Sequence, residues 1–166
     1  ALLNGRNVSL ISPRRMGKTG LIHNLFYHLQ REQQEWECIY IDIYATKSLA
    51  DLVRVLAREV VERLATPLQK TGTNILNVLR GIKLTMEFDP ITNQPQWSVS
   101  VQPQEVSQSL EGIFQLLQSL DQAVVIAIDE FQQVMEYPER NIEAILRTHV
   151  QPAHNVRFIF SGSKQH

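Results

Sequence analysis

The sequence predicts an α/β protein whose central, mostly parallel sheet is covered by helices. Four short apolar segments lack the alternation of a half-exposed strand, which indicates strands that are buried on both faces. Segments with helical spacing of apolar residues separate them, and this alternation of strands and helices favours a doubly wound sheet. The expected strands are residues 7–11, 37–44, 123–128 and 156–160.

The expected helices follow in the order that this fold requires. Residues 21–29 form an amphipathic segment after the first strand, and residues 49–64 repeat apolar side chains at helical spacing, with Ser48 as the N-cap. Residues 106–120 show the same spacing, and a shorter helix over 141–149 precedes the last strand. The 166 residues suffice for one domain with a sizeable core.

Residues 82–102 depart from this pattern. Residues 83–88 and 97–101 alternate apolar with polar side chains, and turn-forming residues fill 89–95. These features predict an antiparallel β-hairpin with one solvated face, inserted into the α/β core. We expect the hairpin to contact a partner or a second copy of the chain.

Composition and charge narrow the classes of partner. The net charge is −1, so no strong field attracts nucleic acid or an anionic membrane, and direct nucleic-acid binding is not expected. No apolar segment reaches the length of a transmembrane helix. Cys38 is the only cysteine and is expected to be a buried packing residue. A single cysteine forms no disulfide within the chain, which fits a reducing cytosol and a cytoplasmic location.

The first expected strand runs into a phosphate-binding motif. The segment Ser12-Pro-Arg-Arg-Met-Gly-Lys-Thr19 follows the P-loop pattern G-x-x-x-x-G-K-[ST] except at its first position. Backbone N–H groups and the N-terminus of the next helix hold phosphates in such a loop. The expected nucleotide-binding residues are Ser12, Pro13, Arg14, Arg15, Met16, Gly17, Lys18, Thr19 and Gly20.

Two side chains of this loop have expected roles in chemistry. Lys18 would reach the β- and γ-phosphates, and the hydroxyl of Thr19 would ligate Mg²⁺. Ser12 stands where the pattern has glycine, which predicts some conformational cost in the turn. The alternative is a surface Gly-Lys-Thr turn that caps a helix and binds nothing.

An acidic pair follows the third expected strand. Residues 124–128 are apolar and lead directly into Asp129 and Glu130. We expect Asp129 to hold the hydrated Mg²⁺ beside Thr19, and Glu130 to orient and deprotonate the attacking water. The alternative is an N-cap aspartate followed by a glutamate in the first turn of a helix. A second acidic residue, Glu130, directly after the aspartate expected to hold Mg²⁺ distinguishes this chain from nucleotide kinases and translational GTPases.

Polar residues also end the fourth expected strand. Ser161 and Ser163 are both candidates to contact the γ-phosphate or the attacking water, and the sequence does not choose between them. An ordinary Ser-Gly turn is the competing interpretation.

The motifs together resemble a known group of proteins. Ser-Pro-Arg-Arg-Met-Gly-Lys-Thr, Ile-Tyr-Ile-Asp-Ile-Tyr-Ala-Thr-Lys-Ser, Val-Ile-Ala-Ile-Asp-Glu-Phe-Gln and Phe-Ile-Phe-Ser-Gly-Ser look like the archaeal-type AAA-like ATPases. These are STAND-class P-loop NTPases that also occur in bacteria. The resemblance implies a three-layer αβα sandwich of the additional-strand, catalytic-glutamate type. In that fold a further strand separates the P-loop strand from the strand that ends at Asp129.

The resemblance also implies roles for residues and for the chain. Lys18 and Thr19 become the Walker A pair, Asp129 and Glu130 the Walker B pair, and Ser161 or Ser163 the sensor. The nucleotide is expected to be ATP, because the preference for adenine follows from the family. Residues 1–166 would be an incomplete ATPase core, with a helical lid and a winged-helix-type domain after residue 166.

The functional hypothesis is therefore Mg²⁺-dependent ATP binding with slow hydrolysis by a signalling switch. Its partners would be ATP and an unknown protein, with nucleotide-dependent self-association. One alternative is a DNA-associated ATPase whose DNA-binding domain lies outside these residues. Another is an interaction module that binds nucleotide without hydrolysing it.

Overall fold

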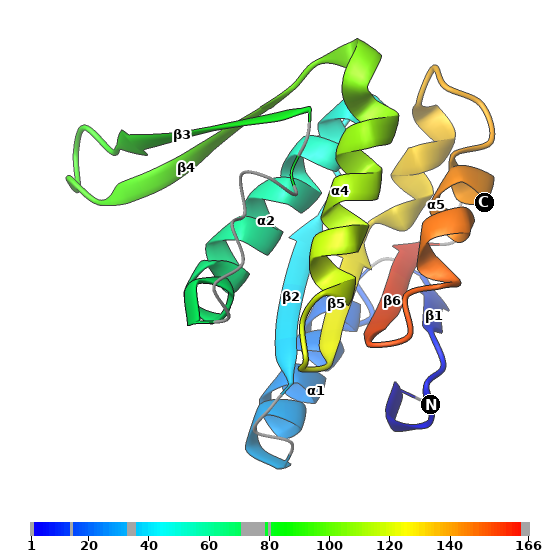
Figure 1. Ribbon diagram of the computed structural model, residues 1–166. Helices are drawn as coiled ribbons and strands as arrows, with labels where there is room; N and C mark the ends of the chain where they lie inside the picture. The colour runs from blue at the N-terminus through cyan, green and yellow to red at the C-terminus, as the bar shows by residue number, and fades with distance from the viewer. Residues whose placement is uncertain (1, 14, 33–35, 71–78, 80, 164–166) are drawn as a thin grey trace.

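Four parallel strands form the central sheet of the computed structural model, which describes residues 2–13, 15–32, 36–70, 79 and 81–163 (Figure 1). The strands are β1 (Val8–Ser12), β2 (Glu37–Asp42), β5 (Val124–Asp129) and β6 (Val156–Ser163), in the spatial order β1-β6-β5-β2. The expected parallel sheet is confirmed. Strand β6 lies between the strand that enters the P-loop motif and the strand that ends at Asp129, as the resemblance implied.

Helices cover both faces of the sheet and complete three layers (Figure 1). Helix α1 (Lys18–Glu32) packs on one face, where its apolar side chains meet those of β2, β5 and β6. Helices α2 (Leu49–Lys70), α4 (Val106–Gln118) and α5 (Ile142–Val150) lie on the other face. Among the described residues, no helix combines the length and the apolar character needed to cross a membrane.

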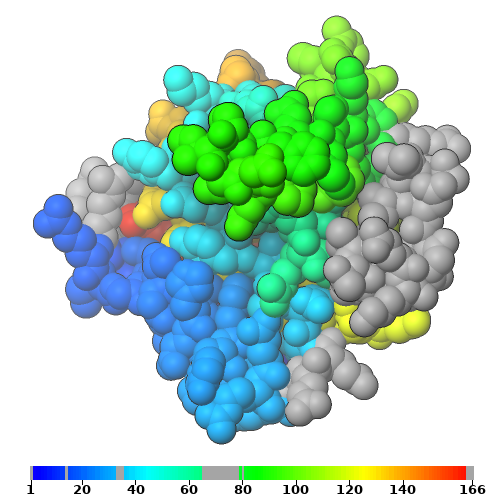
Figure 2. All heavy atoms as spheres, turned by 90° about the vertical axis from the view of Figure 1, so that its left-hand side faces the viewer, coloured from blue at the N-terminus to red at the C-terminus, as the bar shows by residue number. Residues whose placement is uncertain are grey.

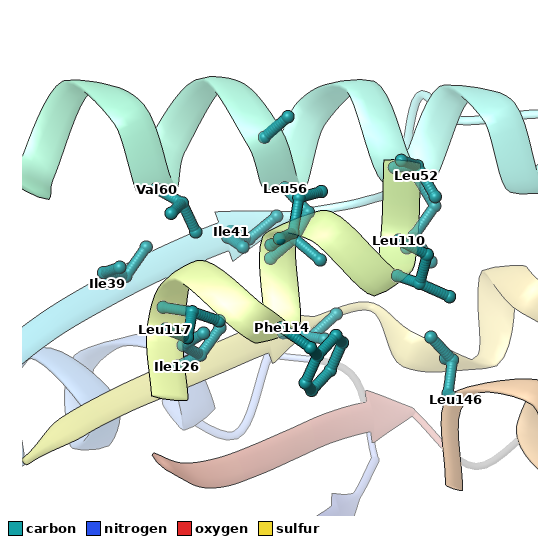
Figure 3. Close-up of a cluster of buried hydrophobic side chains, with 14 of the residues drawn as sticks. Ile39, Ile41, Leu52, Leu56, Val60, Leu110, Phe114, Leu117, Ile126 and Leu146 are labelled. Atoms are coloured by element: carbon teal, nitrogen blue, oxygen red, sulfur yellow. The ribbon is translucent and has the colours of Figure 1, made fainter. Parts of the chain in front are cut away.

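The larger core lies between the sheet and the three helices α2, α4 and α5 (Figure 3). Every residue of β5 is buried, which explains why this strand shows no polar alternation in the sequence. The labelled core side chains are Ile39, Ile41, Leu52, Leu56, Val60, Leu110, Phe114, Leu117, Ile126 and Leu146. The burial of these apolar side chains stabilises the sheet. The sheet in turn holds in place the polar residues at the ends of its strands.

The expected hairpin is present as β3 (Ile82–Phe88) and β4 (Pro95–Val101), antiparallel and in register from Ile82 opposite Val101 to Phe88 opposite Pro95. Its base packs against α2, and Val99 is 8% exposed. Its tip extends away from the sandwich (Figure 1). The apolar side chains of Phe88 and Ile91 are 63% and 92% exposed. Figure 2 shows the green atoms of the hairpin lying over the cyan atoms of α2.

Several elements differ in length from the expectation. Helix α1 begins at Lys18 rather than near residue 21, because the last residues of the P-loop motif form its first turn. Strand β2 stops at Asp42, whereas β6 continues to Ser163. Helix α2 continues to Lys70, and the Ser48 hydroxyl accepts a hydrogen bond from the backbone N–H of Asp51, as expected of an N-cap.

Within the described part of the chain, three short 3-10 helices were not expected. They are η1 (Leu2–Asn4), η2 (Pro103–Glu105) and η3 (Phe131–Glu136). Helix η3 follows β5 directly, so it stands where the sequence offered a regular helix capped by Asp129. Its end is tied to the loop after β2, because the hydroxyls of Tyr137 and Thr46 lie 2.6 Å apart.

Candidate functional site

The polar residues singled out in the sequence meet at one edge of the sheet. Strands β1, β5 and β6 all end there, because parallel strands direct their carboxyl ends to the same side, and α1 begins there. The edge encloses a cavity of about 600 Å³, a size typical of small-molecule sites. Its lining residues are Arg15, Met16, Gly17, Lys18, Thr19, Tyr44, Asp129, Glu130 and Ser163.

Two described residues of the loop between β1 and α1 have a left-handed backbone. Arg15 and Gly17 have φ angles of 63° and 74°, in the left-handed region that favours glycine. Ser12 is not one of these residues, since it ends β1 in register with Ser163. The glycine of the usual pattern is therefore not needed here for a left-handed backbone, and Arg15 carries the strained conformation instead.

The ammonium group of Lys18 is held inside the loop. Its Nζ donates hydrogen bonds to the carbonyl oxygens of Ser12 and Pro13, at 3.4 and 3.2 Å, and to the hydroxyl of Ser163 at 3.2 Å. An ammonium has three N–H donors, so all of them have a partner in this structure. The loop thus keeps a positive charge at the cavity wall, where phosphate oxygens can replace these neutral acceptors.

The carboxylate of Asp129 joins the two motifs. Its Oδ2 accepts hydrogen bonds from the hydroxyls of Thr19 at 2.8 Å and Tyr40 at 2.7 Å, and its Oδ1 accepts the backbone N–H of Glu130 at 2.9 Å. Asp129 is only 4% exposed. Burial would raise the pKa of this carboxyl, but the nearby hydroxyls of Ser161, Tyr40 and Thr19 and the N–H of Glu130 together lower it.

Tyr40 takes part in this group as a donor. Burial, its hydrogen bond to Asp129 and the charge of that carboxylate raise the pKa of the Tyr40 phenol, so the hydroxyl keeps its proton. No pattern in the sequence pointed to this residue, because its role depends on β2 lying beside β5.

Glu130 is held in a defined position at the end of β5. Its backbone is left-handed, with φ 57° and ψ 37°. Its Oε2 accepts a hydrogen bond from the side-chain amide of Gln132, whose Oε1 accepts the backbone N–H of Ser163 at 3.0 Å. The Ser163 N–H fixes which way the amide points, so the NH₂ must face Glu130. No side-chain cap is made to η3 at this position, contrary to the alternative of an acidic helix start.

The two serines of β6 occupy different environments. Ser163 lines the cavity, and its hydroxyl accepts from Lys18. Ser161 is fully buried behind Asp129, close enough to help lower its pKa, although no described group completes a hydrogen bond of normal geometry with its hydroxyl. Geometry therefore favours Ser163 as the residue that faces a ligand.

The expected nucleotide-binding set is gathered only in part. Ser12 and Pro13 contribute backbone carbonyls to Lys18, while Gly20 lies within α1 and not on the cavity wall. Arg14 lies outside the described residues. The sequence analysis missed Tyr40, Tyr44 and Gln132, and the only signal for Tyr44 was its place at the end of the second expected strand.

The oxygen donors at this edge fit a magnesium ion. Mg²⁺ prefers oxygen ligands and is usually held by one or two protein groups together with waters and phosphates. Thr19 Oγ1 and Asp129 form such a pair. Among the described residues, no three His, Cys, Asp or Glu side chains cluster as a self-contained metal site.

Comparisons with known proteins identify one matching family and several structures with a similar fold. The AAA domain family matches residues 4–166. The fold is similar to the ORC1 protein of Aeropyrum pernix in complex with DNA, with TM-score 0.56, 14% identity, and coverage of 96% of this chain and 33% of that chain. It is also similar to ORC2 of the same organism in ADPNP–ADP complexes, with TM-score 0.54, 16% identity, and coverage of 98% and 37%.

Cdc6p from Pyrobaculum aerophilum has a similar fold as well, with TM-score 0.54, 12% identity, and coverage of 95% of this chain and 32% of its own. The chain thus spans about a third of the length of these proteins. At these identities the likeness shows the fold alone. A search of curated proteins gave no match.

Proposed function

Since the chain belongs to the AAA domain family, we propose that it binds ATP with Mg²⁺ in the cavity at the ends of β1, β5 and β6. We further propose that it hydrolyses ATP slowly and serves as a conformational switch. The observation that carries the proposal is the 2.8 Å hydrogen bond between Thr19 and Asp129. It joins two motifs that lie 110 residues apart in the sequence, in the arrangement that a nucleotide–magnesium site requires.

The chain's own residues would divide the work of this site. When bound, Mg²⁺ neutralises phosphate charge and orients the phosphates. The Lys18 ammonium exchanges its carbonyl acceptors for phosphate oxygens, and Thr19 and Asp129 hold the metal. Glu130, positioned by Gln132, accepts a proton from the attacking water. Ser163 hydrogen-bonds to both Lys18 and Gln132, so it would link the residue that holds the phosphates to the residue that positions Glu130.

We attribute the proposed slow turnover to the charges at the cavity. Arg15, in the loop itself, is the one arginine on the cavity wall among the described residues. An arginine supplied from another domain or subunit accelerates such reactions by about 10³–10⁵. We propose that this group comes from a neighbouring subunit or from a lid and winged-helix-type domain after residue 166, and that nucleotide controls self-association or binding of a partner protein. We also propose a cytosolic location, which would supply ATP and keep the buried thiol of Cys38 reduced.

The test is calorimetric binding of ATP with Mg²⁺ to the wild type and Lys18→Ala, together with hydrolysis by the wild type and Glu130→Gln. We expect Lys18→Ala to lose at least about 10-fold in affinity, because one charge-assisted contact is removed. Glu130→Gln should bind ATP normally but hydrolyse it about 10² to 10⁴ times more slowly. Lys83→Ala, on the hairpin and away from the cavity, is the matched control and should bind like the wild type.

Two results would change the proposal. Wild-type affinity in Lys18→Ala would exclude this loop as the phosphate site. Intact ATP after long incubation with the wild type, unaltered by Glu130→Gln, would instead support a binding module that does not hydrolyse nucleotide.

A DNA-associated ATPase is the second candidate function. The observation in its favour is the likeness in fold to ORC1 of Aeropyrum pernix, a protein solved in complex with DNA. The net charge of −1 argues against DNA contacts by these residues themselves. Binding of duplex DNA that weakens steeply with salt would favour this candidate over the signalling switch.

A further inference from the structure

Tyr40 lies one diagonal step from Asp129 on the sheet. In the register of β2 and β5, Tyr40 pairs with Ala127 and Asp42 pairs with Asp129. Alternate residues of a strand face the same side, so the side chains of Tyr40 and Asp129 both lie on the face that α1 covers. A tyrosine is long enough to span such a diagonal, and its hydroxyl reaches Asp129 Oδ2 at 2.7 Å.

The hydrogen bonds around Asp129 leave few free acceptor positions. Each carboxylate oxygen accepts about two hydrogen bonds. Oδ2 already has two, from Thr19 and Tyr40, whereas Oδ1 has one, from the N–H of Glu130. The buried hydroxyl of Ser161 nearby completes no hydrogen bond of normal geometry among the described residues, so the open position is on Oδ1. The proton of the Thr19 hydroxyl is directed to Asp129, which leaves the lone pairs of that hydroxyl for a cation.

The ring of Tyr40 is held before any ligand arrives. It packs on the smaller hydrophobic cluster beneath α1, and its centroid lies 4.8 Å from that of the His23 ring. A tyrosine side chain has few rotatable bonds, so packing of the ring also fixes the hydroxyl.

We propose that Tyr40 is a positioning residue for the magnesium site, and this rests on the proposed function. Its hydroxyl holds Oδ2 of Asp129, so that Oδ1 of Asp129 and the hydroxyl oxygen of Thr19 remain available to the hydrated cation. A hydrogen bond that orients a metal-binding group typically raises metal affinity by about 10- to 100-fold.

The test is Tyr40→Phe, which keeps the ring and removes only the hydroxyl. A fluorescent N-methylanthraniloyl derivative of ATP is bound first in EDTA, and Mg²⁺ is then titrated in. We expect the Mg²⁺ concentration at half-maximal response to rise about 10-fold or more in Tyr40→Phe. Affinity for the nucleotide in EDTA should not change, because Tyr40 does not line the cavity. Tyr27→Phe, which removes an exposed hydroxyl on α1 away from the cavity, is the matched control and should behave like the wild type.

Each other outcome contradicts the proposal in a different way. An unchanged Mg²⁺ midpoint in Tyr40→Phe would exclude the positioning role while leaving the nucleotide site intact. An equal loss of affinity with and without Mg²⁺ would show that the hydroxyl is merely structural. Absence of nucleotide binding by the wild type would overturn the proposed function and this inference with it.

Discussion

At the residue scale, the candidate site consists of polar atoms whose hydrogen-bonding partners are already in place. Lys18, Thr19, Asp129 and Glu130 each contact another member of the site or its supporting residues. Their positions are therefore set before a ligand binds, which reduces the reorganisation that binding requires. The sequence predicted these four residues from spacing, but the supporting side chains of Tyr40 and Gln132 depend on contacts between strands.

Cys38 offers a pH-dependent prediction at this scale. The pKa of its thiol is raised from 9.0 to about 11, chiefly by burial. The positive charge of Arg63 lowers this pKa, and the negative charge of Glu37 raises it. The thiolate is the reactive form, so at pH 9 alkylation in the folded protein should be about 50-fold slower than in the unfolded chain from ionisation alone. Rates measured with iodoacetamide should rise in the folded protein up to about pH 11.

The sign of the effect on stability follows from the same pKa. A raised pKa in the folded state favours the protonated thiol, so its contribution to stability is complete below pH 9 and is lost as the pH rises toward 11. Cys38→Ala should lack this part of the pH dependence. Equal alkylation rates in the folded and the unfolded chain would show that the thiol is accessible.

At the element scale, the hairpin has two parts with different roles. Its base contributes the buried side chain of Val99 to the core beside α2. Ile82 and Trp97, which are partly buried, also pack against this core. Its tip exposes Met86, Phe88 and Ile91. The sequence predicted the hairpin from its alternation of apolar and polar residues. That alternation runs through both parts, so it does not show which residues of the hairpin pack against α2.

This division predicts unequal effects of two deletions. Replacement of residues 88–95 by an Asn-Gly turn should change the free energy of unfolding by less than about 1 kcal/mol and leave ATP affinity unaltered, because the tip contacts little. Deletion of residues 82–101 should cost several-fold more, since it exposes apolar surface of α2. Urea unfolding followed by circular dichroism measures both. A severe loss from the first deletion would mean that the tip is part of the core.

At the scale of the whole molecule, the sheet joins the motifs that the sequence separates. The loop before α1, the end of β5 and the end of β6 meet only when all four strands are paired in the order β1-β6-β5-β2. A ligand that contacts all three segments therefore binds only the folded chain.

Ligand binding should consequently stabilise the fold as a unit. At a nucleotide concentration of about 100 times Kd, binding to the folded state alone adds about 2.7 kcal/mol to the free energy of unfolding. We expect ATP with Mg²⁺ to raise the melting temperature of the wild type but not that of Lys18→Ala, as measured by differential scanning calorimetry. An equal rise in both proteins would indicate binding elsewhere.

The sequence by itself determined the strands, most helix positions, the hairpin, the phosphate-binding motif that contains Lys18, and the acidic pair Asp129 and Glu130. These features depend on local periodicity and on spacing along the chain, which no later packing step alters. Only the tertiary structure decided which serine of β6 faces the cavity, that Ser12 needs no left-handed turn, and that Tyr40 and Gln132 support Asp129 and Glu130. The physical reason is that strand order and side-chain direction bring these groups together from distant segments, and neither is encoded in any single stretch of residues.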